Sequence, residues 1–219
     1  MGPMVKRGIN NTFGPYCVID GDVTIGSHNK FQSHVSVGSP AEHRSIQGNG
    51  GVIIGDRNEF REFVTINSGL TPSSPTIIGN GCYLMTKCHI GHDAIIEDDV
   101  TLSCLSIVGG HSCVMRGANI GLGAVIHQKR VVGTLAMVGM NSTVSRHVLP
   151  CVVAFGSPAK ALRINRVGLT RQNWDPDLIE AWDVYLSNLQ SHSDMNHEKM
   201  NLVDEQIERW SNRVKAVED

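Results

Sequence analysis

The sequence predicts an all-β parallel β-helix built from six-residue repeats, followed by a small C-terminal α-helical region. Three observations support this: an aliphatic residue returns at every sixth position, glycine often follows it, and aromatic residues are scarce. Phe, Trp and Tyr make up 5% of the chain, whereas Gly accounts for 23 of its 219 residues. Such a composition is typical of a repeat protein rather than of a domain with an aromatic core.

The repeat runs without a gap from Ile78 to Leu149, which gives 12 rows of six residues. Helices need apolar positions every three or four residues and ordinary strands every two, so a strict period of six fits neither. It suits short strands joined by tight turns, where Gly permits unusual backbone angles. The first position is aliphatic in every row: Ile78, Leu84, Ile90, Ile96, Leu102, Val108, Val114, Ile120, Ile126, Val132, Val138 and Val144.

Three such strands form one triangular coil, so the structural period is 18 residues. Successive coils then bury one another's first-position side chains, as in other solenoids. Earlier rows follow the same pattern, and we expect the β-helix to occupy residues 10–168. Two polar interruptions rich in Gly, Pro and Ser, at about 39–51 and 68–75, should be loops that leave the coil, which are common places for binding residues.

The period ends after Pro150, and residues 169–219 should form a helical region. Asp175 and Pro176 resemble a helix start, with Asp as the cap and Pro in the first turn. We expect the apolar faces of two helices to pack against each other or against a neighbouring subunit. These faces carry Leu178, Trp182, Tyr185 and Leu189 on the first helix and Val203, Ile207, Trp210 and Val214 on the second.

Composition and charge exclude several classes of function. A formal net charge of −2 and a pI near 6.5 argue against nucleic-acid binding driven by counterion release. No apolar stretch has the length of a membrane span, and the N-terminus lacks the apolar segment of a signal peptide. The six cysteines form no CxxC pair, and three of them share one repeat position as small buried residues. We therefore expect a cytoplasmic protein.

The 18-residue period also predicts a polar cluster. His92, Gly110 and Gln128 occupy one repeat position on successive coils, which lie about 4.8 Å apart. Asp93 and His111 stack in the same way, and His127 lies beside Gln128. A lone histidine is usually structural, but the convergence of several favours a functional site centred on His92.

Metal binding is the main competing use of clustered histidines. Trimeric β-helix carbonic anhydrases use three histidines, two of them four residues apart on one strand. No two histidines of this chain have that spacing, and His89 and His92 fall in different rows of the repeat. We therefore predict no catalytic metal. A scaffold without activity does not need these side chains to align at intervals of one coil. The alignment therefore favours an enzyme over a scaffold.

Several motifs resemble the UDP-N-acetylglucosamine O-acyltransferase family of lipid A synthesis (LpxA). The similarity covers roughly residues 13–172. It is carried by the Ile54–Asn58 and Arg61–Ile66 segments, by His89-Ile90-Gly91-His92-Asp93, by Gly110-His111, by Val125-Ile126-His127-Gln128 and by Ile164–Arg171. This resemblance implies a left-handed coil, against the usual right-handed crossover rule, and a homotrimer with active sites between subunits.

The resemblance also assigns roles. His92, with Asp93, would be the general base that deprotonates the sugar hydroxyl as it attacks a thioester, because a neutral imidazole suits that task. The Gly110 N–H would stabilise the oxyanion. The residues expected to contact or orient the nucleotide sugar are His89, His111, His127, Gln128, Asn67, Asn165 and Arg171. Met140 stands where the family sets the depth of the acyl groove, which predicts a short or medium acyl chain.

The chain also departs from the family pattern. Asn67 stands where the family usually has a histidine near the phosphates. The 39–51 loop lacks the family's acidic sugar-contacting sequence at the matching offset, although Glu42 is adjacent to it. These differences fall on contacts with the acceptor, so they concern the identity of the acceptor more than the acyl-transfer chemistry. The main prediction is O-acylation of a UDP-amino sugar by acyl carrier protein, without a cofactor. An alternative is N-acylation of a nucleotide-linked amino sugar from acyl carrier protein or coenzyme A, because Gly156–Lys160 is similar to coenzyme-A-dependent enzymes.

Overall fold

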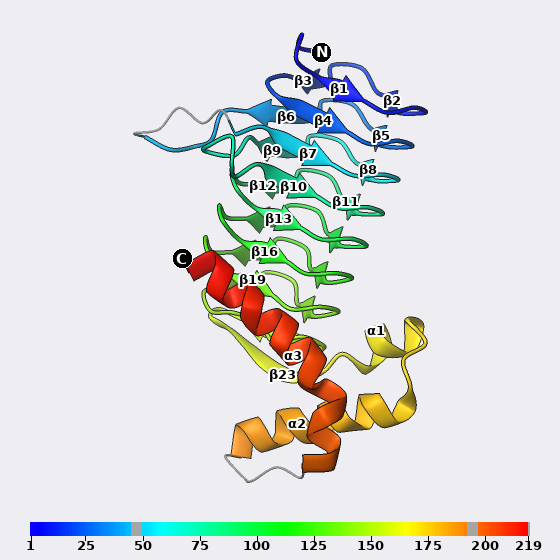
Figure 1. Ribbon diagram of the computed structural model, residues 1–219, viewed down its shortest axis with the longest axis vertical. Coiled ribbons are helices and arrows are strands. Elements are labelled where there is room, and N and C mark those ends of the chain that lie inside the picture. Colours follow the sequence, from blue (N-terminus) through cyan, green and yellow to red (C-terminus); the bar gives the residue numbers. More distant parts are fainter. Residues whose placement is uncertain (45–49, 192–196, 219) are drawn as a thin grey trace.

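The computed structural model describes residues 1–44, 50–191 and 197–218, and it shows a three-sided parallel β-helix with three α-helices at its C-terminal end (Figure 1). Each coil contributes one short strand to each of three parallel sheets, which we call sheets A, B and C. The rows of strands rise along the molecular axis from the C-terminal helices to the N-terminus. This is the arrangement that the period of six predicts.

The bounds of the strands follow the repeat. Sheet A contains β1 (Lys6–Arg7), β4 (Val23–Ile25), β7 (Val52–Ile54), β10 (Thr76–Ile78), β13 (Ile95–Ile96), β16 (Cys113–Val114) and β19 (Val131–Val132). Sheet B contains β2 (Thr12–Phe13), β5 (Lys30–Phe31), β8 (Glu59–Phe60), β11 (Tyr83–Leu84), β14 (Thr101–Leu102), β17 (Asn119–Ile120), β20 (Met137–Val138), β22 (Val152–Gly156) and β23 (Ala159–Ile164). Sheet C contains β3 (Val18–Ile19), β6 (Ser36–Ser39), β9 (Thr65–Asn67), β12 (His89–Ile90), β15 (Ile107–Val108), β18 (Val125–Ile126) and β21 (Thr143–Val144).

The pairing register confirms the 18-residue coil. Ile78 pairs with Ile96 on sheet A, and Ile90 pairs with Val108 on sheet C. Across the two predicted interruptions the spacing lengthens, so that Ile25 pairs with Ile54 and Ile54 with Ile78. The second loop contains a small bridge between Thr71 and Ser74. Of the first loop, residues 45–49 lie outside the described part of the chain.

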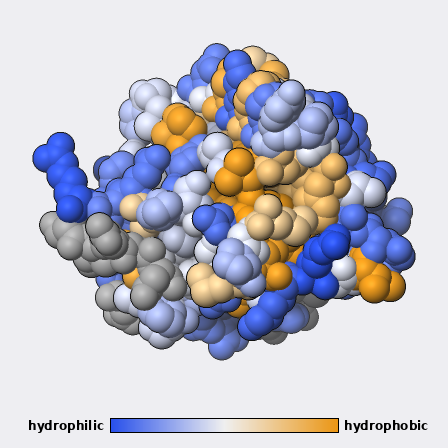
Figure 2. Space-filling model, turned by 90° about the horizontal axis from the view of Figure 1, so that it is seen from above, coloured by the Kyte–Doolittle hydropathy of each residue, from blue (hydrophilic) through white to orange (hydrophobic). Residues whose placement is uncertain are grey.

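The first-position side chains form the interior. All twelve aliphatic residues from Ile78 to Val144 are at most 1% exposed. Near the N-terminus the interior becomes aromatic, and Phe31 stacks between Phe13 and Phe60 with ring centroids 4.9 Å and 4.5 Å away. The first coil has no coil above it, so Phe13 is only partly buried. Seen from this end, apolar atoms lie at the centre of the molecule within a hydrophilic rim (Figure 2).

The C-terminal end is closed by the antiparallel hairpin of β22 and β23 and by α1 (Arg166–Arg171), so the predicted boundary between residues 168 and 169 falls inside α1. Asp175 accepts a hydrogen bond from the Asp177 N–H at the start of α2 (Pro176–Ser191), as its sequence predicts. Trp182 is fully buried and lies edge-on to Tyr185. No described helix is long and apolar enough to cross a membrane.

The last helix, α3 (His197–Glu218), turns back along sheet A of its own chain (Figure 1). Trp210 packs with Cys113, Met115 and Val131, and its Nε1–H donates to the Val148 carbonyl at 2.8 Å. Glu97 forms ion pairs with Arg209 at 3.0 Å and with Arg213 at 2.9 Å. The prediction that this apolar face packs on another helix or another subunit was therefore wrong for Trp210 and Val214, which both cover sheet A.

Candidate active site

The predicted polar cluster lies in the turns that join sheet C to sheet A. His92 and Asp93 occupy the turn between β12 and β13, and Gly110 and His111 occupy the same turn one coil later. The His111 N–H donates to the His92 carbonyl at 2.9 Å, which places the two turns directly on one another. Asp93 and His111 have φ angles of 58° and 57°, in the left-handed region that Asp and His tolerate better than most residues.

Asp93 holds the His92 ring in place. Its Oδ2 lies 2.6 Å from His92 Nδ1, and the Asp93 side chain is only 2% exposed. The same carboxylate accepts the Leu70 N–H at 3.1 and 3.2 Å, and the Asp93 N–H donates to Thr76 Oγ1 at 2.9 Å. The Leu70 N–H holds the carboxylate and the Thr76 hydroxyl holds the Asp93 backbone. A carboxylate fixed in this way sets the tautomer of its imidazole partner, so that Nδ1 carries the hydrogen and Nε2 is free to accept one.

Gly110 presents its backbone to the His92 ring. A Cβ atom at Gly110 would lie 2.8 Å from both Cε1 and Nε2 of His92, so only Gly fits beside this ring. The Gly110 carbonyl accepts the Lys129 N–H. Within the described residues, the Gly110 N–H itself donates to no protein acceptor. An unused N–H beside a nitrogen that can accept a proton is the pair of groups that acyl transfer requires.

Two further histidines surround His92. The His111 ring is perpendicular to it with centroids 5.0 Å apart, and the His43 ring, from the first loop, is perpendicular at 6.4 Å. His111 Nε2 lies 3.9 Å from Asp93 Oδ2. Burial lowers the pKa of His111, and the Asp93 carboxylate opposes that shift only in part. Burial therefore favours the neutral form of His111.

His89 lies on β12, on the outer face of sheet C. Its Nδ1 is 2.9 Å from Thr65 Oγ1. Burial lowers the pKa of His89, while the nearby Glu42 carboxylate acts in the opposite direction. The start of the first loop therefore brings Glu42 towards His89 and His43 towards His92.

The remaining predicted residues of this corner lie around its edge. His127 and Gln128 are exposed one coil beyond His111, and His127 Nδ1 is 3.1 Å from the Gln128 carbonyl oxygen. Asn67 is 6% exposed, and its Nδ2–H donates to the Pro40 carbonyl at 2.9 Å. Its Oδ1 is buried without a partner among the described residues. Asn67 thus anchors the first loop.

Asn165 and Arg171 lie on a different face of the molecule. They line a pocket of about 490 Å³ over sheet B, together with Asn119, Met137 and Arg163. Asn165 also caps α1: its Oδ1 accepts the Gly168 N–H, and its Nδ2–H donates to the Leu135 carbonyl. Within one chain this pocket lies on sheet B, whereas His92 stands at the corner of sheets C and A.

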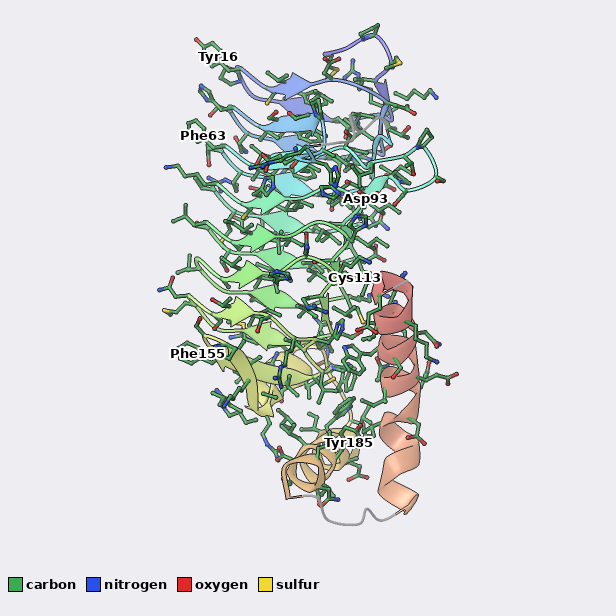
Figure 3. All side chains as sticks on the ribbon, turned by 90° about the vertical axis from the view of Figure 1, so that its left-hand side faces the viewer. Tyr16, Phe63, Asp93, Cys113, Phe155 and Tyr185 are labelled. Carbon is green, nitrogen blue, oxygen red and sulfur yellow. The ribbon has the colours of Figure 1, made fainter. Side chains whose placement is uncertain are left out.

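Met140 is also remote from His92 within one chain. It follows β20 in the turn that joins sheet B to sheet C, and it is 58% exposed. Gly139 lies against the Phe155 ring at this corner. Figure 3 shows Phe155 on the opposite edge of the β-helix from Asp93. Within one chain the predicted site residues therefore occupy two corners and one face of the β-helix.

Sequence reasoning missed three residues that contact the cluster: His43, Leu70 and Thr76. Thr76 is the first residue of β10, directly after the second loop, and Leu70 acts through its backbone. His43 was visible only as the residue after Glu42 in a loop expected to bind. Both loops were expected to carry binding residues, and that expectation was the signal in the sequence that could have pointed to these three residues.

Comparisons with known proteins give the family of the chain. The chain is 41% identical over 184 residues to the acyl-(acyl-carrier-protein)–UDP-N-acetylglucosamine O-acyltransferase of Syntrophobacter fumaroxidans, covering 83% of this chain and 71% of the relative. It belongs to this acyltransferase family. The family enzyme of Gloeothece citriformis is 31% identical over 201 residues, covering 89% of this chain and 70% of that relative. No family model matches the chain.

The fold is that of the same family. The UDP-N-acetylglucosamine O-acyltransferase (LpxA) of Moraxella catarrhalis RH4 superimposes with a TM-score of 0.80 at 27% identity, covering 98% of this chain and 96% of that structure. The Francisella novicida acyltransferase, 23% identical, has a TM-score of 0.82 over 97% of this chain and 85% of its own, and it shares the fold. The expected left-handed parallel β-helix with C-terminal helices is confirmed.

Proposed function

We propose that this acyltransferase moves an acyl group from acyl carrier protein to a hydroxyl of UDP-N-acetylglucosamine, with His92 as the general base. The acceptor oxygen attacks the thioester carbonyl carbon and its proton passes to His92 Nε2. The tetrahedral intermediate then expels the carrier's thiol, which takes the proton from His92. Asp93 keeps the ring in the tautomer that this cycle needs.

The observation that carries the proposal is the arrangement of His92 between Asp93 and Gly110. The 2.6 Å contact with Asp93 leaves Nε2 as the basic nitrogen, and the Gly110 backbone lies next to that nitrogen. The Gly110 N–H can donate to the oxyanion that forms at the carbonyl carbon, where a fixed dipole stabilises developing charge. The relatives are named O-acyltransferases, which favours a hydroxyl over an amine as the acceptor.

The two separated groups of residues support an active site between subunits. The base stands at the corner of sheets C and A, whereas Arg171 and Asn165 line a pocket over sheet B. In a C3 homotrimer one subunit's corner faces another surface of its neighbour, so a heterologous interface joins different parts of two chains. The site would then combine the base of one subunit with the Arg171 pocket of the next.

We assign the acceptor contacts accordingly. His89, His111, His127 and Gln128 line the sugar side of the corner, and Asn67 contributes through the first loop that it anchors. Arg171 suits a diphosphate because its forked donors match phosphate oxygens. Asn165 shapes the nucleotide pocket while it caps α1. The acyl donor is a thioester substrate, no cofactor or metal takes part in the chemistry, and the reaction belongs in the cytoplasm.

One experiment tests the function. The purified protein is incubated with acyl carrier protein that carries 3-hydroxyacyl groups, in parallel with coenzyme A thioesters, and with a panel of nucleotide sugars. Mass spectrometry of the product, with and without alkaline hydrolysis, separates esters from amides. An ester of UDP-N-acetylglucosamine from the carrier-protein donor is the expected product. An amide product would refute O-acylation, and activity only with coenzyme A thioesters would refute acyl carrier protein as the donor.

A further inference from the structure

The turns at the sheet C and sheet A corner bring together three groups that bind metals. One ligand atom each from His92, Asp93 and His111 lies within 4.8 Å of the other two. His92 Nδ1 is 2.6 Å from Asp93 Oδ2, and His111 Nε2 is 3.9 Å from the same oxygen. Two imidazole nitrogens and one carboxylate oxygen therefore lie in one cluster.

These spacings fit a small transition-metal ion. Zinc binds His nitrogen and Asp oxygen at about 2.0–2.2 Å, so ligand atoms around a tetrahedral ion lie roughly 3.3 Å apart. The separations of Asp93 Oδ2 from His92 Nδ1 and from His111 Nε2, 2.6 and 3.9 Å, lie on either side of that value. Hard cations such as Mg²⁺ prefer six oxygen ligands and have no match here, because two of the three donors are imidazoles.

The carboxylate is positioned as metal-ligating carboxylates are. Asp93 is 2% exposed, and the Leu70 N–H donates to both of its oxygens, at 3.2 and 3.1 Å. Such supporting hydrogen bonds fix a ligand's orientation and raise metal affinity. His111 is 36% exposed, so an ion has a path from solvent and keeps one open coordination position.

We propose that His92, Asp93 and His111 bind Zn²⁺ or a similar transition-metal ion, and that the bound ion switches off the enzyme. An ion on His92 Nδ1 takes the place of the hydrogen shared with Asp93. The ring then carries its hydrogen on Nε2, and that nitrogen accepts no proton from the acceptor hydroxyl. The binding rests only on geometry, whereas the inhibition rests on the proposed role of His92 as base.

Binding is measured without reference to activity. The metal-stripped protein is titrated with Co²⁺ and its visible absorption recorded, and Zn²⁺ affinity is measured by competition. We expect one ion per chain with the absorption of a tetrahedral site. Asp93→Asn and His111→Ala should each weaken Zn²⁺ binding by about 10–100-fold or more. His127→Ala, which removes a histidine one coil beyond His111, is the matched control and should leave the affinity unchanged.

Activity is then measured in the same samples. Zn²⁺ should stop acyl transfer at the occupancy found in the titration, a chelator should restore it, and millimolar Mg²⁺ should have no effect. An octahedral spectrum, or equal Zn²⁺ affinity in His111→Ala, would overturn the site. Binding without loss of turnover would overturn the inhibition. Absence of acyl transfer by the metal-free protein would instead refute the proposed function, whatever the titration shows.

Discussion

The backbone of Gly110 lies so close to the His92 imidazole that a Cβ atom at Gly110 would be 2.8 Å from its Nε2. Gly110→Ala should therefore displace the ring from the position that Asp93 gives it. A misplacement of about 1 Å can cost roughly 10²-fold in rate, and we expect a fall of that order in kcat. Steady-state kinetics on the variant measures it, with thermal unfolding as the control for the fold. Normal turnover in a folded variant would show that this contact does not position the base.

His92→Ala should lower kcat by about two to four orders of magnitude, because it removes the general base. The side chain lies in a turn and is not part of the apolar interior, so the assembly should be unchanged in light scattering. His127→Ala is the comparison: it removes a proposed sugar contact and should raise KM more than it lowers kcat. A His92→Ala enzyme with near-normal kcat would exclude His92 from the mechanism.

Asn58→Ala should destabilise the β-helix. The buried Asn58 side chain accepts the Cys82 N–H at 2.7 Å and donates to the Gly79 carbonyl at 2.9 Å, and its backbone N–H donates to Asn29. The substitution leaves two buried backbone groups without partners, at about 1–3 kcal/mol each. Denaturant unfolding measures the loss. Asn11→Ala is the control, because Asn11 is half-buried in the first coil and its loss should cost less.

The interior was predictable from the sequence because one rule governs it. A side chain such as Ile96 meets only the coils above and below, so the period of six alone places it. The same period placed His92 over Gly110 and Asp93 over His111. It also predicted that loops would leave the coil, because polar residues rich in Gly and Pro interrupt the aliphatic series.

The packing of α3 and the contacts of the loops could not be predicted from the repeat period. The amphipathic pattern of α3 indicates a buried face, but not that Trp210 packs on sheet A of the same chain. Leu70 contacts Asp93 through its backbone N–H, and the identity of residue 70 does not reveal such a contact. Arg171 and Met140 were grouped with His92 by family resemblance. The structure places Arg171 on another face and Met140 at another corner. Motifs that follow one another in the sequence can lie on different sides of a three-sided coil.

Mixed trimers test whether the two groups of residues meet between subunits. His92→Ala and Arg171→Ala chains, each nearly inactive alone, are unfolded together in equal amounts and refolded. Random assembly into a C3 trimer restores both intact residues in about one quarter of interfaces, so about a quarter of wild-type activity should return. Light scattering establishes the assembly. If the mixture stays as inactive as its components, or the protein is a monomer, the base and the arginine do not share a site in this way.

The length of the acyl chain should depend on Met140. This side chain is 58% exposed and stands at a corner remote from His92, so it can end the groove only where a neighbouring subunit brings the two together. A chain that overlaps a packed wall costs about 1–3 kcal/mol, whereas each extra buried methylene gains only about 0.8 kcal/mol. We therefore expect a preference for short or medium 3-hydroxyacyl donors, and Met140→Gly should shift it towards longer chains. Donor competition with graded chain lengths measures both enzymes, and Leu122→Gly, one coil earlier at the same corner, is the control. An unchanged preference in Met140→Gly, or a wild-type preference for long chains, would show that the groove ends elsewhere.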